Sequence, residues 1–218
     1  MEEKTMRDMI HLTFGEEVGN AISHGVMALA CLFVLPFAAV YSYLVGGVVR
    51  AVGVSIFIIC LFLMFLISTI YHSMDYNTEQ KYVFRKLDHI CIYLAIAGSY
   101  TPIALCVVQG WLGVLILVLE WGAVFAGILL KSISKKAYPV LSTTIYLVVG
   151  WTAVFFIPAL LQDASFLFLS FIVMGGVMYS AGVYFYSKHK KFFHFVWHLF
   201  INAASILHFI AIVFFMSK

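Results

Sequence analysis

Long apolar stretches with almost no charged side chains recur along this chain from one end to the other. A stretch of about 20 apolar residues is long enough to cross the hydrocarbon core of a bilayer as a helix. Of the 218 residues, 64% are hydrophobic and only 11% are charged, whereas a soluble domain has about a quarter of its residues charged. The sequence therefore predicts an all-α integral membrane protein and excludes a soluble globular domain.

Seven such stretches predict a bundle of seven transmembrane helices. No shift in composition and no linker separates them, so we expect a single domain over residues 1–218. The segment before the first stretch is too long and too acidic for the start of a signal peptide, so the first span is expected to be retained. The predicted spans are residues 20–44, 51–71, 88–108, 111–130, 138–161, 165–187 and 193–216.

The basic residues predict the orientation of these helices. Flanks on the cytoplasmic side of a membrane are enriched in lysine and arginine, and alternate flanks of this chain hold most of the 13 basic residues. We therefore expect a cytoplasmic amino terminus and an outer carboxy terminus, in the cell membrane (the inner membrane of a bacterium). Anionic lipid at the inner surface accounts for the net charge of +3, so no binding of nucleic acid is expected. The basic residues in the first set of flanks are Lys4, Arg7, Lys81, Arg85, Lys86, Lys131, Lys135, Lys136, Lys188, Lys190 and Lys191.

Metal-ligating residue types occur at the inner ends of three predicted spans. His194 and His198 are four residues apart at the start of the seventh span, so they share one helical face. Ser68 and His72 end the second span with the same spacing, and Asp88 begins the third. The topology places His72, Asp88, His194 and His198 at one depth near the cytoplasmic surface, with Ser68 one helical turn above His72. The alternative is that the histidines are interfacial polar residues bonded to water or lipid phosphate.

Three histidines with an open fourth position are typical of a catalytic zinc ion. The candidate ligands are His72, His194 and His198. Asp88 would orient a water molecule or take its proton, and Ser68 would donate a hydrogen bond to a substrate carbonyl or a developing oxyanion. Imidazole ligands also suit iron, copper and nickel, and the ordinary interpretation of Ser68 alone is a hydroxyl bonded to its own helix.

Glu120 lies near the centre of the fourth predicted span, where a carboxyl group is costly. It indicates either a path for protons or substrate, or a neutral acid that is hydrogen-bonded to a neighbouring helix. Both interpretations stay open.

Polar residues also precede and begin the first predicted span. One interpretation is that they border the metal site from the same inner face. The favoured one is an interfacial lead-in, with glutamates at a helix amino terminus where the macrodipole stabilises negative charge. These residues are Glu16, Glu17, Asn20 and His24.

Five motifs together resemble one family. The chain contains "EEVGNAISHG", "STIYH", "KLDHICIY", "AGSYTPI" and "HFVWHLFINAASILHF" in this order. It resembles bacterial hemolysin III (TrhA-type) proteins, within the superfamily of progestin and adiponectin receptors (PAQR). The resemblance implies a seven-helix fold with the amino terminus inside, and zinc bound by His72, His194 and His198 with Asp88 and Ser68 close by.

Alkaline ceramidases share this arrangement of serine, aspartate and histidines, and they hydrolyse a lipid amide. The leading hypothesis is therefore a zinc-dependent membrane hydrolase that acts on an amide or ester of a membrane lipid or lipid-like substrate. One alternative is a non-catalytic membrane sensor or homeostasis protein with a structural zinc ion. Another is a cytolysin or pore. The sequence does not specify any protein partners, which stay unknown.

Overall fold

A computed structural model describes residues 11–133, 139–188 and 190–216, which form helices and turns without any β-strand among them. Six segments are long and apolar enough to cross a membrane. This confirms the predicted all-helical class. The elements are α1 (Phe14–His72), α2 (Glu79–Pro102), η1 (Ile103–Val108), α3 (Gly110–Ile133), α4 (Pro139–Gly150), η2 (Thr152–Phe156), α5 (Ile157–Asp163), α6 (Phe166–Tyr186), α7 (Phe193–Ile210) and η3 (Ala211–Phe215).

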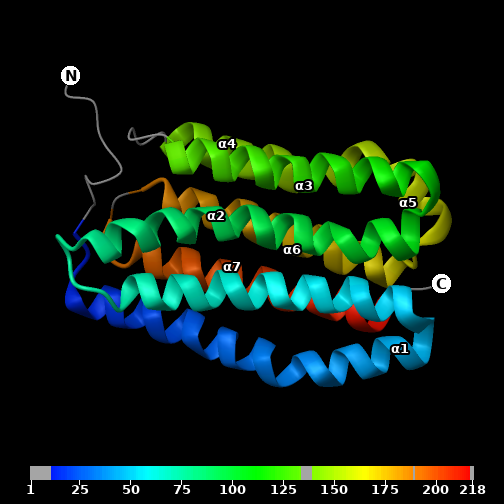
Figure 1. The fold of residues 1–218 in the computed structure, drawn as a ribbon, viewed down its shortest axis with the longest axis horizontal. Helices are drawn as coiled ribbons and strands as arrows, with labels where there is room; N and C mark the ends of the chain where they lie inside the picture. Colours follow the sequence, from blue (N-terminus) through cyan, green and yellow to red (C-terminus); the bar gives the residue numbers. More distant parts are fainter. Residues whose placement is uncertain (1–10, 134–138, 189, 217–218) are drawn as a thin grey trace.

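The first of these segments, α1, folds back on itself and forms a hairpin with two arms (Figure 1). The backbone leaves the helical conformation at Gly46 and Gly47, and Gly47 has a φ of +72°, which favours glycine. The arms run antiparallel, because Glu17 near the start of α1 contacts His72 at its end. The hairpin thus brings two distant parts of the sequence together at one end of the bundle.

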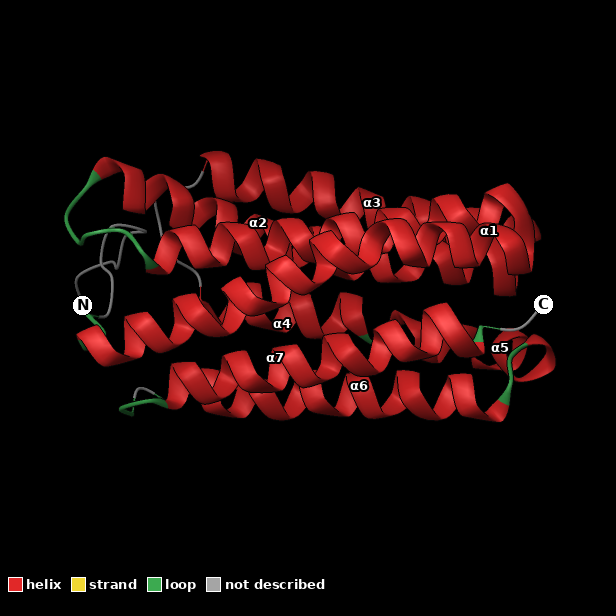
Figure 2. Cartoon of the chain, turned by 90° about the horizontal axis from the view of Figure 1, so that it is seen from below, coloured by secondary structure: helices red, strands yellow, loops and turns green. Residues whose placement is uncertain are grey.

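The remaining helices extend the bundle on both sides of this hairpin. The most extensive contacts join α1 to α2, α2 to α3, and α6 to α7, while α7 also packs against α1 (Figures 1 and 2). A buried core between them includes Phe57 of α1, Phe168 of α6 and Ile212 of η3. Large apolar side chains on the outer faces are exposed, for example Val118 and Phe125 of α3, as expected for surfaces in contact with lipid.

Arg50 connects the bend of the hairpin to the end of the chain that the structure describes. Its guanidinium is buried, and it donates hydrogen bonds to the carbonyl oxygens of Met216 (2.5 Å) and Val213 (3.0 Å). The carbonyl end of a helix carries partial negative charge, so a cation is stabilised there. This contact holds η3 against the second arm of α1.

The segment between α4 and α5 interrupts the helix in the middle of a candidate span. Backbone groups that a break releases inside a membrane need other partners. The Tyr100 hydroxyl of α2 donates to the Gly150 carbonyl and accepts from the Ala153 N–H, both at 2.8 Å. Tyr100 therefore supports this break from a neighbouring helix.

The described part of the structure has six candidate spans where the sequence predicts seven, because the first two predicted spans are the two arms of α1, and the fifth predicted span is broken between α4 and α5. Most other bounds agree to within a few residues, and the larger differences are at two amino-terminal ends. The structure starts α1 at Phe14 instead of residue 20, and α2 at Glu79 instead of residue 88. Both extensions carry charged residues that the hydropathy pattern assigns to loops, but Glu16 and Lys81 are buried in polar contacts. Of the basic residues used to predict orientation, those outside the described residues are Lys4, Arg7, Lys135 and Lys136.

Candidate metal centre

Three histidine rings converge at the end of the bundle where α1 begins. His72 ends the second arm of α1, and His194 and His198 occupy one face of the first two turns of α7. Ligand atoms of the three residues all lie within 4.8 Å of one another. The ring centroids are 4.9 to 5.2 Å apart. The structure therefore brings together the three residues predicted to bind a metal.

At least one ring nitrogen of each histidine in this cluster lacks a hydrogen-bond partner. Nε2 of His72, Nε2 of His194 and both ring nitrogens of His198 are buried and unpaired. A buried polar atom without a partner costs about 1–3 kcal/mol, and three together suit a shared cation. Zinc–nitrogen bonds of about 2.0–2.1 Å hold two ligands at most about 4 Å apart, so one ion would draw these rings slightly closer. The donor set fits zinc.

Glu17 orients the ring of His72. Its Oε2 lies 2.5 Å from His72 Nδ1, and its Oε1 accepts a hydrogen bond of 2.7 Å from Lys81 Nζ. A carboxylate paired with an ammonium group is ionised, so Nδ1 carries the hydrogen and donates it. The lone pair is then on Nε2, which faces the cluster. Carboxylates fix metal-ligating histidines in this way.

Lys81 is fully buried beneath this carboxylate, although it belongs to the first turn of α2. Its Nζ also donates to the Met74 carbonyl at 2.9 Å and lies 3.9 Å from the ring centroid of Tyr76. Burial and a hydrogen bond to Glu17 raise the pKa of the Tyr76 hydroxyl, which keeps its proton. Through Lys81, Glu17 thus fixes the connection between α1 and α2 next to the histidine cluster.

Glu16 connects the amino-terminal end of α1 to that of α7 through hydrogen bonds. It completes a capping box with Thr13, in which Oε2 accepts from the Thr13 N–H at 2.9 Å. Its Oε1 accepts from the Phe192 N–H at 2.6 Å, next to the first residue of α7. One carboxylate therefore joins the two helix ends that carry most of the site.

Asn20 and His24 also contact the histidine cluster. Asn20 Nδ2 lies 3.5 Å from His72 Nδ1, and the His24 ring stacks on His198 with centroids 3.7 Å apart. Both nitrogens of His24 are buried and unpaired. The structure thus favours the interpretation in which the residues before the first span border the site, over an interfacial lead-in. Their signal in the sequence is the spacing of Glu17, Asn20 and His24, which places them on one helical face.

Asp88 and Ser68 lie beside the cluster. The Asp88 carboxylate is half-buried and lies near the buried Ser68 side chain and the His72 ring. His89 turns away, since its Nδ1 lies 2.8 Å from the Arg85 carbonyl oxygen of its own helix. Asp88 is therefore the acid of α2 that is next to the histidines.

Glu120 is the one predicted site residue that the structure keeps away from the cluster. It lies on α3 and contacts Thr152 of η2. The polar residues further along α7 are hydrogen-bonded to neighbouring helices: Ser205 pairs with the Tyr179 hydroxyl at 2.8 Å, and His208 Nε2 lies 3.2 Å from the Ile172 carbonyl oxygen.

Comparison with known proteins gives the family. A family model described as haemolysin-III related matches residues 12–209. The chain is 34% identical to a hemolysin-3 homolog of Bacillus subtilis, covering 94% of this chain and 97% of the relative. It is 32% identical to hemolysin-3 of Bacillus cereus, covering 92% of each. A human monocyte to macrophage differentiation factor is 25% identical, over 68% of this chain and 64% of its own length. The family predicted from the motifs is confirmed: this chain belongs to the haemolysin-III-related family of membrane proteins.

Proposed function

We propose that this protein is a zinc-dependent membrane hydrolase that acts on an amide or ester of a lipid-like substrate. The observation that supports the proposal is the convergence of three imidazoles, His72, His194 and His198, each with a buried and unpaired nitrogen, next to a carboxylate. His24 is near, but its nitrogens are not among the mutually close ligand atoms. A fourth position is thereby left for water or substrate, as in catalytic zinc sites.

The residues around the cluster have distinct tasks in this proposal. Bound zinc supplies Lewis acidity toward water and carbonyl oxygens. The Asp88 carboxylate orients the attacking water and accepts its proton. Ser68 lies near Asp88, so its first task would be to hold that carboxylate, and rotation of its side chain would allow it to donate to a substrate carbonyl. Glu17 keeps His72 in the tautomer that binds metal.

The position of the site favours a lipid-like substrate. We infer that the chain crosses the membrane seven times, with the two arms of α1 as separate crossings and the histidines near the cytoplasmic surface. Described basic residues lie at this end of the helices, which supports that orientation. The membrane would be the cell membrane, since the relatives with the higher identities are from Bacillus species. The basic residues are Lys81, Arg85, Lys86, Lys131, Lys188, Lys190 and Lys191.

Purified protein in lipid vesicles is expected to release fatty acid from at least one class of N-acyl lipid or acyl ester. Removal of metal with a chelator should abolish the release, and addition of zinc should restore it, because water activation needs the ion. Mass spectrometry of the lipids measures the product. Zinc bound without turnover of any amide or ester would contradict a hydrolase and leave a membrane sensor with a structural ion. Leakage of a trapped solute, independent of zinc, would instead indicate a cytolysin.

A further inference from the structure

A second group of buried polar side chains surrounds the break between α4 and α5. Tyr100 of α2, Glu120 of α3 and Thr152 of η2 meet there. Tyr100 is twelve residues beyond Asp88 on the same helix, a distance of about 18 Å along its axis. This group is therefore well separated from the histidine cluster.

Glu120 is one of the most enclosed side chains in the described part of the protein, with 2% of its surface exposed. Its Oε1 lies 2.5 Å from Thr152 Oγ1, and its Oε2 is buried without a hydrogen-bond partner. No basic side chain among the described residues forms an ion pair with it. An ionised carboxylate in such surroundings is very costly, and in practice it is neutralised.

A count of the hydrogen atoms in these contacts also indicates that Glu120 is protonated. Thr152 Oγ1 lies 2.5 Å from Glu120 Oε1 and 2.8 Å from the Val149 carbonyl oxygen, and the Tyr100 hydroxyl lies 2.8 Å from the Gly150 carbonyl oxygen. Each of these three contacts needs one hydrogen between its oxygens. The two hydroxyls carry one each, and carbonyls carry none. The third hydrogen must therefore belong to Glu120.

We propose that Glu120 and Thr152 form a proton-binding site in the middle of the helical bundle, in which Glu120 carries the proton and donates it to Thr152. Thr152 then donates to Val149, so that one bound proton connects α3 to the broken segment. Tyr100, the other titratable group that faces Glu120 within the described residues, holds the same segment from α2. Without the proton on Glu120, the single hydrogen of the Thr152 hydroxyl could serve only one of its two contacts, so the bond to Glu120 or the bond to Val149 would be lost.

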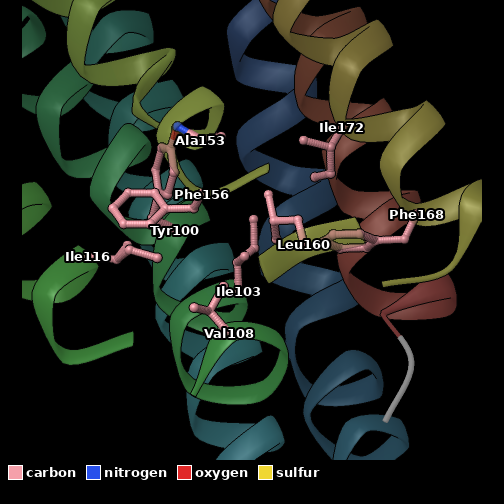
Figure 3. A pocket seen from close by; sticks show the side chains of 9 residues that line it. All are labelled: Tyr100, Ile103, Val108, Ile116, Ala153, Phe156, Leu160, Phe168 and Ile172. Carbon is pink, nitrogen blue, oxygen red and sulfur yellow. The ribbon is translucent and has the colours of Figure 1, made fainter. Parts of the chain in front are cut away.

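An apolar pocket lies beside this site. Tyr100, Ile116 and Ala153 are among the side chains that line it (Figure 3). Ile116 is one helical turn before Glu120, and Ala153 directly follows Thr152. A hydrophobic reagent that reacts with protonated carboxyl groups is therefore the suitable probe for a carboxyl group in these apolar surroundings.

Infrared spectroscopy of the protein in lipid vesicles at neutral pH tests the proposal. The wild type should show the carbonyl stretch of a protonated carboxyl group, and Glu120→Gln should lack it, since glutamine keeps the shape of the side chain without the acid. Thr152→Val removes the hydrogen-bond acceptor, so the same band should shift to higher frequency. Asp88→Asn, far from this site, should leave the band in place.

Modification by dicyclohexylcarbodiimide tests the wild-type chain without any substitution. The acid proton moves to a carbodiimide nitrogen as the carboxyl oxygen bonds to the central carbon, and an acyl shift to nitrogen gives a stable N-acylurea. Mass spectrometry should locate this adduct on Glu120. A wild-type spectrum identical to that of Glu120→Gln, with no adduct on Glu120, would show an ionised carboxylate and overturn the proposal.

Discussion

Replacement of Asp88 by asparagine is expected to lower hydrolysis of a lipid amide or ester about 10²–10⁴-fold, while the zinc content of the purified protein stays the same. Asparagine keeps the shape of the side chain and can still bond to Ser68, but it cannot accept a proton from water. The three histidines that would bind zinc are untouched. Turnover in vesicles and elemental analysis of the same samples measure the two effects.

Asp75→Asn is a matched control, since Asp75 is an exposed acid in the connection between α1 and α2. It should keep full activity. Loss of zinc together with activity in Asp88→Asn would assign Asp88 a structural part in the site. Equal activity of Asp88→Asn and wild type would exclude it as the base.

Replacement of Glu17 by glutamine is expected to destabilise the protein by about 3–5 kcal/mol, because it leaves the buried Lys81 ammonium without its carboxylate. It should also weaken zinc binding about 10–100-fold, because His72 loses the acceptor that fixes its tautomer. Thermal unfolding in detergent and competition with a zinc chelator measure the two effects.

The double variant Glu17→Gln with Lys81→Met separates these two consequences. Methionine removes the unpaired charge and keeps much of the side-chain volume, so stability should largely return. Zinc affinity should stay low, because His72 still lacks its carboxylate. Zinc affinity equal to that of the wild type in both variants would show that Glu17 stabilises only the connection between α1 and α2.

Hydropathy predicts the apolar parts of the helices well and their charged ends poorly. The predicted end of the third span at residue 108 coincides with the end of η1, but α2 starts at Glu79, not at residue 88. The additional turns contain Lys81, which is buried only because Glu17, on another helix, neutralises it. A hydropathy pattern contains no information about such a distant partner, so the sequence alone assigns these turns to a loop.

In the candidate site too, some features follow from the sequence and others depend on contacts between distant residues. The spacing of His194 and His198 predicts that they share a helical face, because helix periodicity is a local property of the sequence. The shared depth of His72 and Asp88 follows from the order and direction of the predicted spans, so the two patterns together predict a cluster. The contact between Glu17 and His72 depends on the hairpin at Gly46 and Gly47, which joins positions 55 residues apart. For Glu120, the sequence indicates an expensive carboxyl, but its contact with Thr152 requires the break between α4 and α5.

Elemental analysis of purified wild-type protein, beside His198→Ala and Asp88→Ala, tests most directly whether the three histidines bind a metal. We expect close to one zinc ion per chain in the wild type and in Asp88→Ala, and little or none in His198→Ala. The His198 nitrogens are buried among the other ligands without another partner, so no remaining group replaces them. Wild-type protein that is free of metal when purified without chelator, and that takes up none when zinc is added, would contradict the account.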